Sequence, residues 1–128
     1  MISLSTSNTQ DAVEALVGSH SGVVLLCEHA SGALPSPWGW HEKDEWLTGT
    51  HWAIDIGAAA FCRELHEQVG CSAVLAKFSR LLIDANREVD SPTLIRTTAE
   101  GRRVYMNEAI SEQERTTRIE KYWQPYHQ

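Results

Sequence analysis

The sequence predicts an α/β fold with a mainly parallel sheet, and three observations lead to that prediction. An apolar run at residues 23–27 indicates a buried strand, and a second apolar run follows at residues 71–78. Between them, residues 50–69 carry apolar side chains at spacings of three and four, which is typical of a helix. Strand, helix and strand in this order form a βαβ unit, and its helix-length crossover favours parallel pairing.

The predicted helix and the segments before it follow from local composition. Residues 11–17 indicate a short helix that ends at Gly18. Residues 30–44 contain two prolines, two glycines and two tryptophans, and this composition indicates a structured loop. The helix over residues 50–69 should turn one apolar stripe toward the sheet and end at the following glycine, Gly70. The stripe consists of Ile54, Ala58, Phe61, Leu65 and Val69.

Two further elements are predicted after the second strand. Residues 81–84 read as a third strand of the same sheet, and residues 88–103, which show no clear period, read as a loop. A final helix should start at the Ser-x-x-Glu capping box formed by Ser111 and Glu114. Pro125 should kink or end that helix because its ring cannot occupy a regular helix interior.

The end of the sequence carries an aromatic-rich helix face. In an α/β fold another strand should follow such a helix, so we expect a single domain over residues 1–128 that is truncated at its C-terminus. An unpaired sheet edge and an exposed apolar patch should then remain near the C-terminus and favour self-association. The patch would consist of Ile119, Tyr122, Trp123 and Tyr126.

Composition excludes several classes of partner. The chain has 128 residues and a formal net charge of -6, which argues against nucleic acid or an anionic membrane as the main partner. No apolar run approaches the roughly 20 residues of a membrane helix, and the N-terminus does not resemble a signal peptide. Cys27, Cys62 and Cys71 lack CxxC spacing, so we expect buried free thiols and a cytoplasmic location. The alternative is a catalytic Cys27 paired with His29.

Glu28 and His29 follow the first predicted strand directly. Ligands of α/β sheets collect at the carboxyl ends of the strands, where a rigid strand presents a reactive loop. Imidazole together with carboxylate suits zinc in hydrolytic sites. The structural alternative is a histidine bonded to a loop carbonyl beside a surface glutamate.

His51 and Asp55 are four residues apart in the predicted helix. This spacing would place them on one face of its first turn, where they would form a second wall of the same site. Alternatively, Asp55 favours the helix N-terminal dipole while His51 only packs there.

The densest polar cluster lies around residues 81–83 and consists of Ser79, Arg80, Asp84, Asn86 and Arg87. Arginine recognises carboxylates with a planar fork, which predicts a small anionic substrate. The alternative is an internal ion pair, Arg80 with Asp84 or Arg87 with Asp55. We expect at least one of the two arginines to be mostly buried and paired, because an unpaired buried guanidinium is costly. Glu28, His29, Asp55 and Arg87 should line one concavity.

Together these motifs resemble the N-formylglutamate amidohydrolase family. The ordered set is CEHASG, THWAIDIGA, FSRLLIDANR and RIEKYWQPYH, and it runs from about Val23 to the end of the chain. The resemblance implies a zinc-exopeptidase-like (phosphorylase/hydrolase-like) fold, with a mixed α/β sheet flanked by helices. It also implies hydrolysis of a formamide on an amino-acid-like substrate, with release of formate. The Glu28-His29 pair is typical of the family branch with unassigned substrates.

The resemblance also implies roles for individual residues. Zinc would be held by His29 with Glu28 beside it, and the substrate would be N-formylglutamate or a related N-acyl amino acid. Family members continue into a further strand with an Asp-x-His-Ser type motif, so the metal site of this chain should be short of ligands. The alternatives are a non-catalytic small-carboxylate-binding protein and an inactive truncated family member. The expected site residues are Glu28 and Asp55 as catalytic carboxylates, Ser79, Arg80, Asn86 and Arg87 for substrate binding, and His51 and Asp84 for orientation.

Overall fold

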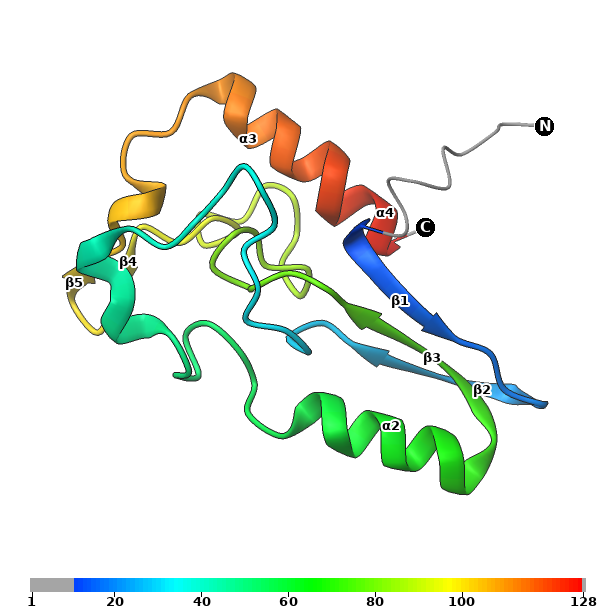
Figure 1. The fold of residues 1–128 in the computed structure, drawn as a ribbon. Coiled ribbons are helices and arrows are strands. Elements are labelled where there is room, and N and C mark those ends of the chain that lie inside the picture. Colours follow the sequence, from blue (N-terminus) through cyan, green and yellow to red (C-terminus); the bar gives the residue numbers. More distant parts are fainter. Residues whose placement is uncertain (1–10, 128) are drawn as a thin grey trace.

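A computed structural model describes residues 11–127, and this part of the chain forms a three-stranded mixed sheet with helices on both faces (Figure 1). The strands are β1 (Val13–Leu16), β2 (His20–Cys27) and β3 (Cys71–Ala76), in the order β1-β3-β2. β2 and β3 pair in parallel, with Leu25 opposite Ala73, whereas β1 is antiparallel to β3. The predicted parallel pair is therefore confirmed.

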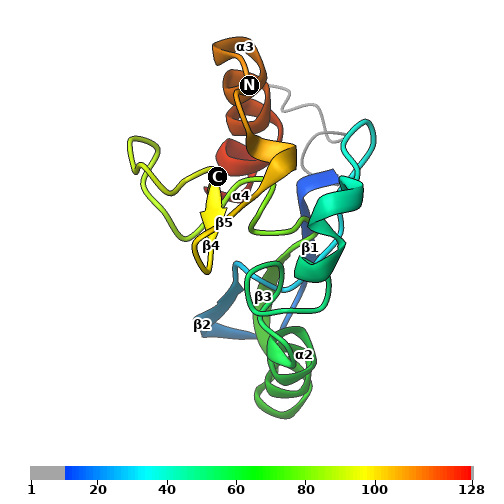
Figure 2. The same cartoon turned by 90° about the vertical axis from the view of Figure 1, so that its left-hand side faces the viewer.

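Helices cover the two faces of this sheet. α2 (Ala58–Val69) connects β2 to β3 and lies on one face. On the other face, α3 (Glu112–Arg118), the π-helical segment η3 (Ile119–Trp123) and α4 (Gln124–His127) form a continuous helical run (Figure 1, Figure 2). No helix within residues 11–127 combines the length and the apolar character needed to cross a membrane.

Short elements lie beyond the end of the sheet. They are the 3-10 helices η1 (Glu42–Leu47) and η2 (Tyr105–Asn107), and a small hairpin of β4 (Thr98–Ala99) and β5 (Arg102–Arg103). The predicted loop over residues 88–103 is therefore interrupted by this hairpin.

The prediction of a helix at residues 11–17 is wrong, because this segment contains strand β1. Its side chains alternate between the two faces of the sheet. Val13 packs into the core cluster that includes Tyr122, whereas Leu16 packs against the cluster that includes Cys62 of α2, and Glu14 pairs with Arg63 of α2. A helix of seven residues is marginal in water, and the free edge of β3 offers this short segment a complete ladder.

The helix predicted over residues 50–69 begins only at Ala58. Gly57 has a φ of 84°, and the residues before it form turns. The predicted stripe is also wrong in part, because Phe61 is 67% exposed and Val69 is 50% exposed. The small side chain of Cys62 is buried against the sheet instead. The predicted end at Gly70 is confirmed: its φ is 76°, and its N–H donates to the His66 carbonyl.

Residues 81–84 are buried as predicted, but they form a turn at Leu81 and Leu82 followed by irregular backbone rather than a third strand. The Leu82 N–H donates to the Ser79 carbonyl. The carbonyls of Leu81 and Leu82 accept hydrogen bonds from the side chains of Asn107 (2.8 Å) and Arg118 (2.9 Å). A buried backbone needs hydrogen-bond partners, and here side chains supply them in place of a ladder.

The C-terminal helical run starts as predicted and ends differently. The Ser111 hydroxyl accepts from the Glu114 N–H at 3.0 Å, which confirms the N-cap. Pro125 does not end the helix. It lies in α4, directly after the π-helical segment, in which the Gln124 N–H donates to the Ile119 carbonyl five residues back.

The apolar surface lies elsewhere than predicted. Tyr122 and Tyr126 are only 3% and 8% exposed and pack in the core, so the expected C-terminal patch does not form. Among the described strands, β2 is an edge of the sheet, and its exposed large apolar side chains are Val23, Val24 and Leu26.

Candidate functional site

Three chain segments meet at the carboxyl end of β2. β2 ends at Cys27, and Glu28 and His29 follow in a turn. The Asp55 N–H donates to the His29 carbonyl at 3.0 Å, which ties the segment before α2 to this turn. The third segment is the buried turn at residues 81–84, which ends at Asp84.

His29 is held between two carboxylates. Its Nδ1 lies 3.1 Å from Asp55 Oδ2, and its Nε2 lies 2.6 Å from Asp84 Oδ1. A carboxylate can only accept, so both ring nitrogens donate when the imidazole is doubly protonated. Burial alone would lower the pKa of His29, but the hydrogen bond and the charge of Asp84 raise it above its usual value. The geometry therefore favours an imidazolium.

Arg80 joins the same two carboxylates from the other side. Its Nη1 lies 3.3 Å from Asp55 Oδ1, and its Nη2 lies 3.2 Å from Asp84 Oδ2. The four side chains His29, Asp55, Arg80 and Asp84 thus form a closed ring of alternating charge, which we call the charge ring. The Arg80 side chain is 21% exposed, so the prediction of a mostly buried, paired arginine is confirmed.

Asp84 is the most heavily contacted member of the charge ring. Its side chain is 6% exposed and also accepts from the Asn86 N–H at 2.9 Å. Arg87 Nε lies 3.8 Å from Asp84 Oδ2, so Arg87 approaches Asp84 rather than Asp55. Burial raises the pKa of Asp84, but the hydrogen bonds from His29 and the Asn86 N–H, together with the charges of His29 and Arg80, outweigh burial and lower the pKa. Asp84 therefore stays ionised beside His29.

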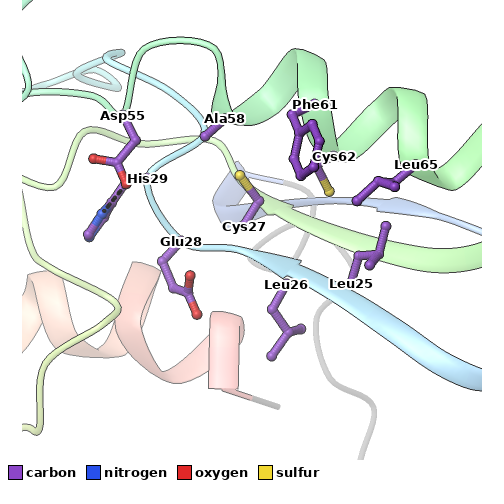
Figure 3. Close-up of a pocket in the computed structure, with 10 residues that line it drawn as sticks. All are labelled: Leu25, Leu26, Cys27, Glu28, His29, Asp55, Ala58, Phe61, Cys62 and Leu65. Atoms are coloured by element: carbon purple, nitrogen blue, oxygen red, sulfur yellow. Dashed lines mark hydrogen bonds and ion pairs between the residues drawn. The ribbon is translucent and has the colours of Figure 1, made fainter.

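A cavity of about 340 Å³ borders the charge ring. Glu28, His29 and Asp55 line its polar end, as predicted, whereas Arg87 is not among its lining residues. Figure 3 shows His29 and Asp55 joined at this end, with the Glu28 carboxylate extending away from α2. The remaining walls are mainly apolar and come from β2 and α2. This combination of a few polar groups with apolar walls is typical of small-molecule sites.

Three predicted site residues lie at the margin of this arrangement. Ser79 is fully buried, and its hydroxyl donates to the Ala53 carbonyl at 2.8 Å and accepts from the Leu81 N–H. The Asn86 side chain is exposed. His51 does not share a helix turn with Asp55, because α2 begins later. Its carbonyl, and not its imidazole, contacts Arg80.

Two buried polar residues that the sequence analysis did not single out support the charge ring. Arg118 is 1% exposed and donates to both the Leu82 carbonyl and Asn107 Oδ1. Asn107 donates to the Leu81 and Arg96 carbonyls. Together they hold the turn that carries Arg80 and Asp84. A single asparagine in a loop and an arginine on a polar helix give no signal of burial in one sequence.

The cysteines support the structural interpretation over the catalytic one. Cys27, Cys62 and Cys71 are free and buried. Burial raises the pKa of the Cys27 thiol to about 11, which disfavours the thiolate. Both ring nitrogens of His29 face carboxylates, so His29 does not serve as the base for this thiol.

The described residues do not complete a zinc site. Within residues 11–127, no three His, Cys, Asp or Glu side chains are grouped so as to hold a metal ion. At the cavity, His29 Nδ1 and Asp55 Oδ2 are two potential donors, and Glu28 lies beside them. Catalytic zinc usually takes three protein ligands.

The fold and this site define an α/β protein with a charged, imidazole-containing site at the carboxyl end of its parallel strands. The family model described as N-formylglutamate amidohydrolase matches residues 21–128, so the chain belongs to this family. The structure is similar to the crystal structure of gene product Atu2144 from Agrobacterium tumefaciens, with 32% identity and a TM-score of 0.77. The match covers 94% of this chain and 48% of that one, so this chain spans about half its length. No curated protein matches.

Proposed function

We propose that this chain contributes to a metal-dependent amidohydrolase acting on N-formylglutamate or a related N-acyl amino acid. The observation that supports this proposal is the charge ring, which borders a 340 Å³ cavity in a chain of this family. We include in the proposal a zinc-exopeptidase-like architecture and a cytoplasmic location, the latter suggested by the free thiols.

The proposed substrate binding rests on the two arginines. Arg80 is committed to Asp55 and Asp84 and would position them. Arg87 is 43% exposed and makes only a 3.8 Å contact, so its guanidinium has donors available for a substrate carboxylate. Glu28 lines the cavity and is the candidate general base for water.

The proposed metal would add a separate contribution. Zinc, when bound, polarises a carbonyl and lowers the pKa of its water. Of this chain's residues, His29 with Asp55 or Glu28 would hold it, and Asp84 would fix the His29 ring through Nε2. Zinc and a proton would compete for His29 Nδ1, so we expect the zinc affinity to rise with pH.

Binding tests the proposed substrate more directly than turnover, because the described residues bring only part of a zinc site together. Calorimetry should show N-formylglutamate binding to the chain, with affinity about tenfold weaker in Arg87→Lys, which loses the fork. Arg63→Lys is the matched control, because the Arg63 side chain is 46% exposed against 43% for Arg87 and lies on α2.

Metal analysis and formate release from the same sample separate the remaining alternatives. Zinc-dependent formate release supports the amidohydrolase. Specific binding without any formate release, with zinc supplied, favours the non-catalytic carboxylate binder. Absence of binding, or equal losses in Arg87→Lys and Arg63→Lys, contradicts the proposed substrate site.

A further inference from the structure

A second cavity, of about 540 Å³, lies beyond the end of the sheet and shares no lining residue with the first. It is lined by Lys43, Trp46, Arg102, Arg103 and Tyr105, which come from η1, β5 and the start of η2, near β4 and β5 in Figure 1. Three of these five residues are cationic, although the whole chain has a net charge of -6. Core packing does not account for this local excess of positive charge.

The walls of this cavity are fixed by buried hydrogen bonds. Asp44 of η1 is fully buried, and its carboxylate accepts from the N–H groups of Tyr105 and Met106, each at 2.8 Å. These charge-assisted bonds join η1 to η2. Glu100 and Gly101 both have positive φ values, 53° and 73°, and form the tight turn of the hairpin that presents the two arginines. The cationic side chains therefore project from a prearranged frame.

The aromatic rings orient the cations without neutralising them. The Arg102 guanidinium lies 3.8 Å from the centroid of the Trp46 ring, and Lys43 Nζ lies 5.0 Å from the centroid of the Tyr105 ring. Within residues 11–127, the ion pair formed by this group of cations is Arg103 with Glu108, at 3.5 Å. Arg103 is also 68% exposed. Most of the positive charge of the cavity is thus available to a ligand.

We propose that this cavity is a second ligand site, which binds a phosphate-bearing small molecule. Arginine forks match phosphate oxygens in a bidentate way, and lysine adds a mobile point charge. Three cations suit a dianion or trianion better than a single carboxylate. The volume lies within the range of about 300–1,000 Å³ that small-molecule sites occupy. This site is independent of the amide chemistry proposed at the charge ring.

Calorimetry with inorganic pyrophosphate as the probe tests this site. In metal-free, low-salt buffer, we expect one pyrophosphate per chain, and binding should weaken about tenfold in Arg102→Gln and in Lys43→Gln. Lys121→Gln is the control, because it removes the same charge from η3, which contributes no lining residue to this cavity. Glutarate, a dicarboxylate of similar size, should bind at least about tenfold more weakly than pyrophosphate.

Three results would overturn the proposal. They are no pyrophosphate binding, an equal loss of affinity in Lys121→Gln, and equal affinity for glutarate. Chemical shift mapping on the unmodified chain covers the case in which a variant fails to fold. Pyrophosphate should then shift the Trp46 indole and the Tyr105 amide signals but leave His29 unchanged, and the opposite pattern would refute the second site.

Discussion

His29 and Arg80 do not compete for acceptor atoms in the charge ring. His29 contacts one oxygen of each carboxylate, and Arg80 contacts the other oxygen. The two carboxylates differ in burial: the Asp84 side chain is 6% exposed and the Asp55 side chain is 47% exposed. Desolvated charges depend strongly on their partners, whereas exposed pairs contribute little. The stability of the ring should therefore depend mainly on Asp84.

Removing each carboxylate in turn tests this asymmetry. Asp84→Asn leaves a buried imidazolium and a guanidinium with one fewer counter-charge, and should lower the free energy of unfolding by about 3–5 kcal/mol. Asp55→Asn removes the other carboxylate that contacts His29 and Arg80, but at an exposed position. It should lower the free energy of unfolding by about 1 kcal/mol or less. Urea denaturation measures both. Equal costs would show that burial does not govern the ring.

The pKa shifts of Asp84 and His29 predict that the folded chain is most stable in an intermediate pH range and less stable on either side of it. The pKa of Asp84 is lowered in the folded state, so its contribution is present above the unfolded value and is lost as pH falls through the folded one. The pKa of His29 is raised, so its contribution is present below the unfolded value of about 6.5 and is lost as pH rises through the folded one. Thermal unfolding of the metal-free chain should show this maximum of stability against pH. Asp84→Asn should make the decrease in stability smaller on both the acidic and the basic side. A profile that Asp84→Asn leaves unchanged would be inconsistent with the coupling.

Much of this residue-scale arrangement could be predicted from the sequence. The polar residues beside two apolar runs pointed to His29, Arg80 and Asp84, and the spacing of His51 and Asp55 pointed to Asp55. The contacts among them could not be predicted, because they depend on where the turn at residues 81–84 lies. Asn107 and Arg118 fix that turn across 26 and 36 positions of sequence, and no local pattern reports such bonds.

At the scale of elements, the sequence predicted correctly those helix ends that depend on a residue at the end itself. The end of α2 at Gly70 depends on the backbone of one residue and the N-cap on the hydroxyl of Ser111, and both predictions are confirmed. The strand at Val13–Leu16 and the turn at residues 81–84 depend on distant partners, and there the predictions are wrong. An apolar run thus predicts burial more securely than it predicts a strand.

Asn107 provides the test at this scale. Its side chain is 1% exposed, donates to two backbone carbonyls and accepts from Arg118. Asn107→Ala takes the side-chain donor away from the Leu81 and Arg96 carbonyls and removes one acceptor of Arg118, and it should lower the free energy of unfolding by about 3 kcal/mol. Asn86→Ala, at an exposed side chain, should stay within about 0.5 kcal/mol. Similar values for both variants would mean that Asn107 does not brace the turn.

At the scale of the whole molecule, three of the eight exposed large apolar side chains of the described residues lie on the edge strand β2, and none lies on the C-terminal helices. Val23, Val24 and Leu26 of β2 are 48%, 58% and 61% exposed. An exposed apolar edge strand is a template for pairing with another chain. Self-association, if it occurs, should therefore involve β2.

A charge on that edge should suppress association. We expect Val24→Lys to lower the fraction of dimers and larger species, because lysine on an edge strand opposes pairing. Thr116→Lys, at an exposed position of α3, is the control and should leave the fraction unchanged. Sedimentation velocity over a concentration series measures both. Association that only Thr116→Lys reduces would place the interface on the helices instead.

We propose that the charge ring around His29 forms the substrate site of this amidohydrolase-family chain. The most direct measurement is nuclear magnetic resonance of the histidine ring nitrogens in a ¹⁵N-labelled, metal-free chain during titration with N-formylglutamate. His66, whose Nδ1 lies 2.6 Å from the Cys71 carbonyl at the far end of α2, serves as the internal control. We predict that both His29 nitrogens stay protonated to a higher pH than in an ordinary histidine, because the pKa is raised, and that their signals shift saturably with the ligand while the His66 signals do not move. Unchanged His29 signals, or equal shifts at His66, would contradict the claim.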